Sequence, residues 1–393
     1  MANAYATGLL NPSYKPTTYD DPQWVAEFML EHIGTFRFNK LMGGTDKPIQ
    51  YRYELKKKGE FMKIPLLGAA RLRGVVNNMA LKGREETADE HLFNVGINLY
   101  RHAFAVTEWD ERRSPVELMP TLRETMMDWI KVQSRDHVID AMFSVKLNTT
   151  QVAPLRNPDP AQVLPGDPAI VNIQTVATAG ELNTWIADNN DRVVFGLTNP
   201  ADTLPNAAFA TCLSGMGSGD KFGAAMINIM KDKADTAHQR RGTNPGYGIR
   251  PLTMGADDET GYVILASLKA FNQALADTDI KEFNKSLVAG NGAKSGTSNP
   301  YFASGDLMWN NCVIKRIPEI SEHSATVGRV IMLGKQALVY AQGDDISFRP
   351  ASDDYEHLKG LAIRESCGIA KLQRELANGK KIDANCVTGF CRI

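Results

Sequence analysis

The chain has 393 residues, of which 43% are hydrophobic and 23% are charged, and its formal net charge is −1. This length suggests two or three domains, or one body that carries long extensions. A net charge near zero gives no general attraction to nucleic acid or to an anionic membrane. No run of about 18 apolar residues is present, so no transmembrane helix is expected. The first ten residues lack the features of a secretory signal.

The five cysteines are an odd number without a Cys-x-x-Cys pair. This usage predicts reduced thiols in an intracellular environment.

The first third of the chain reads as extended structure. Residues 1–22 are rich in Pro, Tyr, Thr and Asn and predict an arm, and residues 24–33 predict a short amphipathic helix. Residues 49–53, 61–66 and 92–100 have strand-like patterns, the last with clear alternation. We therefore expect a long β-hairpin over residues 43–106.

The charge of this hairpin is uneven, because nine basic residues between 52 and 84 are opposed by only Glu54 and Glu60 before an acidic run begins at Glu85. A two-stranded ribbon with few large apolar residues at its tip is not stable alone in water. One interpretation is a solvated basic hairpin. The other is an arm that docks on a neighbouring subunit through complementary charge.

Residues 114–146 predict one long amphipathic helix, with apolar side chains such as Met126, Ile130 and Met142 on one face. Ser114 and Pro115 suit a helix start, but Pro120 allows the regular part to begin as late as Met119. At about 1.5 Å per residue the helix would be roughly 40 Å long.

The rest of the chain alternates strands with helices. Residues 149–168 predict a surface loop, and a second helix is expected to be capped by Ser218 or Asp220 and to end near Ala237. A third helix is predicted at 268–275, and strands are predicted at 191–196, 262–265, 313–317, within 327–339, at 361–364 and at 386–393, with a helix or strand near 369–376.

Patterns that would carry chemistry are weak. Residues 215–221 resemble a phosphate loop but fit neither the dinucleotide nor the Gly-x4-Gly-Lys-Ser/Thr pattern. His137 and Asp140 could share a metal, but two ligands do not make a site, and we expect a surface or interface pair. Residues 257–259 are expected to form an acidic turn. The basic runs 56–58 and 238–241 lack the aromatic residues of a nucleic-acid stacking platform.

Several motifs occur in a recognisable order. They are Gly83-Arg84-Glu85-Glu86 followed by Phe93, Val95, Ile97 and Ala103; Ile249-Arg250-Pro251; Gly261-Tyr262-Val263-Ile264-Leu265; Asn299-Pro300-Tyr301-Phe302-Ala303-Ser304-Gly305; and Arg329-Val330-Ile331-Met332-Leu333-Gly334 followed by Gln336-Ala337. This order resembles the tailed-phage major capsid proteins with the Hong Kong 97-type fold, in particular the N-four-type subfamily. The resemblance covers about residues 30–376.

The resemblance implies an α+β fold and a protein that assembles into the icosahedral head shell around the phage genome. In the family's terms the chain would divide into an N-terminal arm and short helix at 1–42, an extended hairpin loop at 43–106, a peripheral domain with a spine helix at 107–214, an axial domain at 215–343 and a return to the peripheral domain at 344–393. No catalytic, metal-binding or cofactor-binding residue is implied.

The implied partners are copies of the chain itself in pentamers and hexamers. A separate scaffolding protein, a portal, decoration proteins and nonspecific contact with packaged double-stranded DNA are also implied, with assembly in the host cytoplasm and no membrane. The tip of the hairpin is the predicted subunit interface, where the charge is least compensated, through Arg71, Arg73, Lys82, Arg84, Glu85 and Glu86.

Two other interpretations are kept open. An encapsulin-like compartment would share the fold and enclose an enzyme cargo. A nucleotide- or metal-dependent enzyme would use residues 215–221 and 257–259 as its site.

Overall fold

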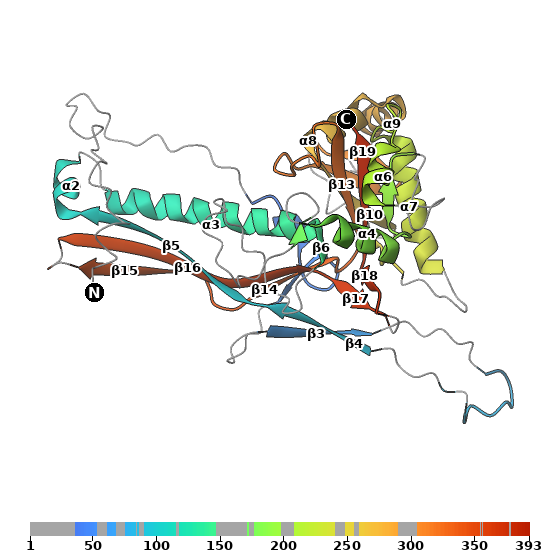
Figure 1. The fold of residues 1–393 in the computed structure, drawn as a ribbon, viewed down its shortest axis with the longest axis horizontal. Helices are drawn as coiled ribbons and strands as arrows, with labels where there is room; N and C mark the ends of the chain where they lie inside the picture. The colour runs from blue at the N-terminus through green and yellow to red at the C-terminus, as the bar shows by residue number, and fades with distance from the viewer. Residues whose placement is uncertain are drawn as a thin grey trace. The chain divides into compact units, whose positions relative to one another are not determined.

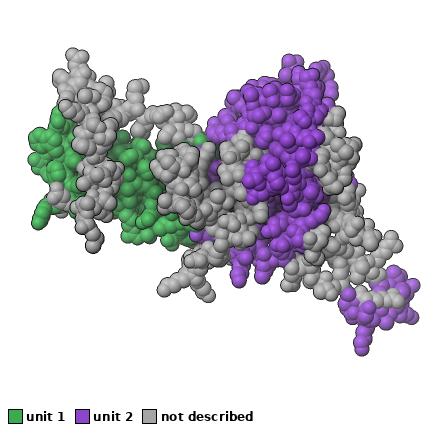
Figure 2. Space-filling view, viewed as in Figure 1, with its two compact units in different colours: residues 1–36, 98–135, 343–367 green, residues 37–97, 136–342, 368–393 purple. Residues whose placement is uncertain are grey.

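The computed structural model of the chain describes residues 36–52, 61–67, 75–83, 85, 90–114, 118–146, 171–172, 177–197, 208–239, 248–254, 259–289, 305–353, 355, 357–376 and 379–393. The chain divides into two compact units, coloured separately in Figure 2. Unit 1 contains residues 1–36, 98–135 and 343–367, and unit 2 contains residues 37–97, 136–342 and 368–393. Each unit therefore combines segments that are far apart in the sequence.

Helices and strands are mixed along the chain, as predicted. The helical segments are η1 Asn39–Leu41, α2 Glu108–Arg113, α3 Leu118–Met142, α4 Ala179–Asp188, α6 Phe209–Ser214, α7 Ala224–Gln239, α8 Leu268–Ala276 and α9 Thr278–Ala289. The strands of the first half are β1 Met42–Gly43, β2 Ile49–Arg52, β3 Phe61–Leu67, β4 Glu90–Gly96, β5 Asn98–Thr107, β6 Ser144–Lys146, β7 Val171–Asn172 and β8 Val193–Phe195. Those of the second half are β9 Leu252–Thr253, β10 Thr260–Ala266, β11 Leu307–Trp309, β12 Cys312–Arg316, β13 Val327–Leu333, β14 Leu338–Gln342, β15 Ser347–Asp353, β16 Leu358–Lys371, β17 Gln373–Glu375, β18 Lys381–Asp383 and β19 Cys386–Arg392.

Unit 1 consists of an antiparallel sheet packed against a helix. The first ten residues of β16 pair with β5, from Leu358 opposite Thr107 to Cys367 opposite Asn98, and β15 pairs with the same strand on its other side. Figure 1 shows α3 running along β5 and β16. Met126 and Ile130 of α3 pack on Leu361 and Ile363 of β16, so alternate side chains of the sheet face the helix.

Unit 2 contains a sheet of order β11-β12-β10-β13-β19-β8, with β9 paired to β10. The side chains of β8 and β13 are buried along their whole length. Such strands read as continuous apolar runs, because both of their faces are covered. Helices α7, α8 and α9 supply Met226, Phe271 and Ile280 to the core cluster that also contains Ile264 and Met332 of the sheet. In Figure 1 the helices lie beside this sheet.

The long helix is shorter than predicted at its C-terminal end. It begins at Leu118, so Pro120 falls in its first turn, where proline is tolerated. It ends at Met142, and residues 144–146 form strand β6 instead of a last helical turn. Ser144 donates from its hydroxyl to the carbonyl of Ala141 at 2.8 Å, an alternative to helical continuation.

Ser114 does not start the long helix, which corrects a second expectation. Its backbone N–H donates to Asp110 O at the C-terminal end of α2, a helix that the sequence pattern did not predict. Thr107 caps α2 by accepting from Asp110 N at 3.2 Å. Helix α2 is missed because it has only six residues and no buried side chain, so no apolar period marks it.

The predicted hairpin over residues 43–106 is also shorter. Among the described residues of this segment, β3 and β4 pair as a hairpin, from Phe61 opposite Gly96 to Leu67 opposite Glu90. Strand β2 pairs in parallel with β14, and β5 pairs with β16. Local alternation shows that a segment is a strand but carries no information on its partner, so these long-range pairings could not be predicted.

Candidate subunit-contact site

The base of the β3–β4 hairpin packs on the chain's own core. Met62 and Ile64 of β3 and Phe93 and Val95 of β4 are buried against a cluster that includes Val339. Period-two alternation places these four side chains on one face of the ribbon. The base of the hairpin is therefore an integral part of unit 2, and contact of the segment with a neighbouring subunit stays a prediction.

The described part of the hairpin tip, residues 75–83 and 85, is exposed apart from Val75, which is half-buried. Val76 is 65% exposed, Met79 is 51% exposed and Leu81 is 57% exposed, so three large exposed apolar side chains lie within six residues of the chain. Asn77 and Gly83 have positive φ angles of 53° and 86°, and a short turn joins Met79 N to Val76 O at 3.4 Å. The tip thus holds apolar side chains in solvent on a turn-rich backbone.

Two of the six predicted interface residues lie in this described tip. Lys82 and Glu85 are both exposed, and Glu85 accepts from Gly83 N at 2.7 Å through Oε2. Arg71, Arg73, Arg84 and Glu86 lie outside the described residues. The apolar residues Val76 and Leu81 were not predicted as contacts. The signal was present, because two short apolar runs, 75–76 and 79–81, interrupt an otherwise charged stretch.

The candidate phosphate loop at 215–221 is occupied by the chain's own carboxylate. Asp220 is buried and accepts from Leu197 N and Gly217 N, both at 2.7 Å. Gly196 has a φ of +58°, and a Cβ there would lie 2.5 Å from Asp220 Cβ, so the close approach requires glycine. The N–H groups that would bind a phosphate at Gly217 and Leu197 already have an anionic partner.

Helix α7 does not use the predicted caps Ser218 or Asp220. It begins at Ala224, whose N–H donates to Asp277 Oδ2 at 3.0 Å. A carboxylate near a helix N-terminus satisfies a free donor and interacts favourably with the helix dipole. The cap comes from the segment between α8 and α9, 53 residues further along the chain, and no local pattern reveals it.

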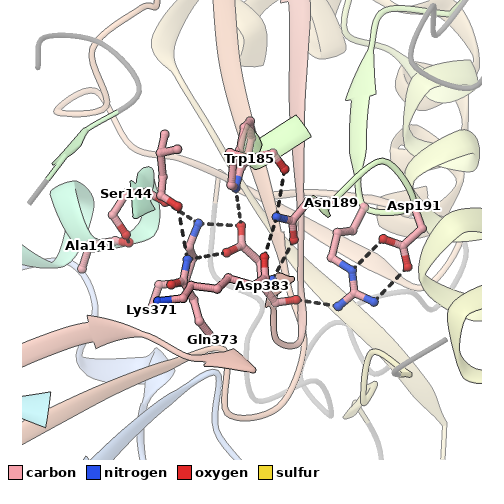
Figure 3. Close-up of polar contacts among 11 residues, drawn as sticks. Ala141, Ser144, Trp185, Asn189, Asp191, Lys371, Gln373 and Asp383 are labelled. Carbon is pink, nitrogen blue, oxygen red and sulfur yellow. Dashed lines mark hydrogen bonds and ion pairs between the residues drawn. The ribbon is translucent and has the colours of Figure 1, made fainter. Parts of the chain in front are cut away.

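A buried polar cluster joins four segments of unit 2 around Asp383 (Figure 3). Asp383, 2% exposed by its side chain, accepts from Lys371 Nζ at 2.6 Å, from Trp185 Nε1 at 3.0 Å and from Gln373 Nε2 at 2.9 Å. Lys371 also donates to the carbonyl of Ser144 at 2.5 Å. A buried ion pair is tolerated when its charged groups also make further hydrogen bonds, as Asp383 and Lys371 do here. The cluster is enclosed and saturated, so its arrangement fits a structural role.

The backbone of Asp383 is held as firmly as its side chain. Its N–H donates to Asn189 Oδ1 at 2.7 Å, and its carbonyl accepts from Arg192 Nη1 at 2.5 Å. Arg192 is itself paired with Asp191, its Nη2 lying 3.0 Å from Oδ2. These contacts join the C-terminal end of α4 and the start of β8 to strand β18.

Other sequence candidates do not form sites. His137 is 1% exposed in the chain, so the expectation of a surface pair with Asp140 is wrong. Residues 257 and 258 lie outside the described residues, as do residues 56–58. Among the described residues, no group of three His, Cys, Asp or Glu side chains could hold a metal ion. No described helix combines the length and apolar character needed to cross a membrane.

Comparisons with known proteins identify the chain. A family model described as phage capsid protein matches residues 18–390. The chain belongs to the phage capsid protein family. No curated protein matches this capsid protein.

Solved structures show the same fold. The capsid of cyanophage Pam1 is 21% identical, with a TM-score of 0.73 over 100% of this chain and 99% of that chain. The capsid of Ralstonia phage GP4 is 17% identical, with a TM-score of 0.67 over 98% of each chain. The capsid of Helicobacter pylori bacteriophage KHP30 is 10% identical, with a TM-score of 0.61 over 94% of each chain.

The predicted α+β fold of the Hong Kong 97 type and the predicted role are confirmed. The chain is a major capsid protein of a tailed phage, and copies of it associate into the head shell of the virion. The family points to a structural protein.

Proposed function

We propose that this capsid protein joins its shell through the tip of the β3–β4 hairpin, which lies on a neighbouring copy. The observation that carries the proposal is the contrast within one hairpin. The base is buried in the chain's own core, whereas Val76 and Leu81 are exposed beside Lys82 and Glu85 at the tip. Apolar side chains rimmed by charged ones are typical of protein interaction sites.

In this proposal the charged residues of the tip steer and orient the contact. Lys82 and Glu85, together with Arg71, Arg73, Arg84 and Glu86, would meet complementary charge on the neighbour. Head-to-tail contacts of this kind close into rings when the rotation between copies is right, which gives the pentamers and hexamers of an icosahedral shell.

We extend the proposal to further partners. A separate scaffolding protein would guide assembly in the host cytoplasm, a portal would occupy one vertex, and decoration proteins would bind outside. The inner surface would contact packaged double-stranded DNA through nonspecific phosphate contacts. The net charge of −1 restricts those contacts to local basic patches.

Charge reversal tests the hairpin contact. The double variant Lys82→Glu with Arg84→Glu is expected to leave the subunit folded by circular dichroism and to abolish shells in electron micrographs. A matched variant, Lys63→Glu with Lys269→Glu, makes the same change of net charge at exposed positions outside the tip. Wild-type yields of shells from the tip variant would contradict the proposal.

A further inference from the structure

The sheet of unit 1 has a second face, opposite to the one that packs on α3. Phe104, Leu361 and Ile363 point toward α3. Because successive side chains of a strand point to opposite faces, the neighbours of these residues lie on the other face. Arg101 of β5, Arg364 of β16 and Arg349 of β15 are among them. We call this second face the arginine face.

The register places like charges side by side on the arginine face. Arg101 lies directly opposite Arg364, and Arg349 lies opposite Ala362, two residues from Arg364 along β16. Adjacent strands are about 4.8 Å apart, and two residues span about 6.8 Å along a strand. Like charges in directly opposite cross-strand positions repel each other. The three guanidinium groups therefore form one concentrated positive patch.

No described carboxylate forms an ion pair with any of these three arginines. Arg364 instead donates from Nε to the hydroxyl of Ser347 at 3.0 Å. Glu365, which follows Arg364 in β16, lies on the opposite face of the sheet, where Ser134 of α3 donates to it at 3.4 Å. Asp353, opposite Leu358, lies on the arginine face but at the far end of β15. A partner that brings negative charge to this face would relieve the repulsion between the arginines.

Between the two ends of the arginine face, the remaining side chains are small; Leu99 lies at one end, opposite Ser366, and Leu358, Thr107 and Asp353 lie at the other. Residues opposite or beside the arginines include Ala103 and Ala105 of β5, Gly360 and Ala362 of β16, and Ala351 of β15. Between the ends of the face, the guanidinium groups therefore belong to the largest side chains. A protein partner would need aromatic or aliphatic anchors and pockets for them, as in most energetic hot spots. A phosphate backbone needs only accessible cations.

We propose that the arginine face binds the phosphate backbone of double-stranded DNA without sequence preference. The inference rests on the proposed contact between the shell and its packaged DNA, and it assigns that contact to Arg101, Arg349 and Arg364. Guanidinium groups suit this role, because they remain charged and donate two parallel hydrogen bonds to phosphate oxygens. Among the described residues of β5, β15 and β16 on this face there is no aromatic side chain for base stacking, which agrees with sequence-independent binding.

The test is a salt titration of DNA binding by the unassembled full-length chain. Binding of a short fluorescent duplex of random sequence is measured by anisotropy between about 50 and 200 mM salt. The wild-type chain is expected to bind more weakly as salt rises. The triple variant Arg101→Gln, Arg349→Gln, Arg364→Gln is expected to bind about tenfold more weakly or worse at low salt. Its slope of log affinity against log salt concentration should be smaller by about 2.7, which corresponds to three lost phosphate contacts.

A matched variant removes three cations from the helices of unit 1. Arg112→Gln, Arg123→Gln and Lys131→Gln lie on α2 and α3 and change the net charge by the same amount. This variant is expected to keep the wild-type slope. Equal slopes for the wild type and the arginine-face variant, or a wild-type chain that does not bind the duplex, would overturn the proposal.

The alternative occupant is an acidic segment of a second copy. A variant of the arginine face that binds DNA normally but no longer forms shells would support that occupant and reject DNA. The proposed hairpin contact is judged separately by shell formation in the Lys82→Glu, Arg84→Glu variant, because DNA binding by the unassembled chain does not require assembly.

Discussion

The same residue types are buried in the interior of unit 2 and exposed at the tip of its hairpin. Lys371 is buried and surrounded by acceptors, whereas Lys82 is exposed in a turn. Phe93 is buried at the hairpin base, whereas Leu81 is exposed at the tip. The comparison indicates that interior residues stabilise the subunit and that tip residues remain available for another copy. Stability and assembly should therefore respond to different substitutions.

The strongest test of this separation is the loss of the buried cation. Lys371→Met leaves Asp383 without its charged partner at a site where water has no access. Breaking a buried pair in this way costs about 3–5 kcal/mol of unfolding free energy. Chemical denaturation of the unassembled subunit measures it, with Lys82→Met as the control, which we expect to change stability by less than about 0.5 kcal/mol. Equal effects of the two substitutions would break the comparison.

An apolar pair sharpens the same comparison along one hairpin. Phe93→Ala creates a cavity beside Met62 and Val339 and is expected to destabilise the subunit by about 3 kcal/mol. Leu81→Ala is expected to leave the denaturation midpoint unchanged but to lower the yield of shells measured by sedimentation. A large loss of stability in Leu81→Ala would show that the tip folds against its own chain.

A smaller effect concerns pH. Burial, with a contribution from the nearby positive charge of Arg329, lowers the pKa of His323 from 6.5 to about 4. Between about pH 6.5 and 4, the His323 imidazole is therefore protonated in the unfolded chain but neutral in the folded chain. The full stability is present above about pH 6.5, and the free energy of unfolding decreases as the pH falls from 6.5 to 4. His323→Gln is expected to reduce the loss of stability between pH 7 and pH 5 by about 1 kcal/mol, after a discount for the partial solvent exposure of the imidazole. Parallel stability profiles for the two proteins would contradict this assignment.

Much of the fold could be predicted from local pattern. The apolar runs around Ile264 and Ile331 become buried strands, and the apolar period around Met126 becomes the centre of α3. What could not be predicted depends on contacts between distant segments. The parallel pairing of β2 with β14 and the capping of α7 by Asp277 have no signature near either partner.

The site was predicted less completely than the fold. Lys82 and Glu85 were identified from uncompensated charge, and the structure shows both in an exposed tip. Val76 and Leu81 were missed, because an apolar residue is assigned to a core by default. Buried charged residues such as Lys371 and Arg192 were missed for the converse reason, since a charged residue in a sequence is assigned to the surface unless its partner is known.

Pro350 limits edge-to-edge strand pairing between copies of this chain. Pro350 lies in the middle of β15, opposite Leu361. The carbonyl of Ser366 in β16 accepts from the N–H of Gly343 on the side of β15, and the carbonyl of His357, just before β16, accepts from the N–H of Glu108 on the side of β5. Because the backbone groups of successive strand residues point to alternate sides, the even-numbered residues of β16 hydrogen-bond toward β15 and the odd-numbered ones, Leu361 among them, toward β5. The nitrogen of Pro350 then points to the outer edge of β15, where any other residue would offer an N–H. This edge is a poor template for strand-to-strand growth, and a protein made in many copies is thereby protected from polymerising into open-ended fibres.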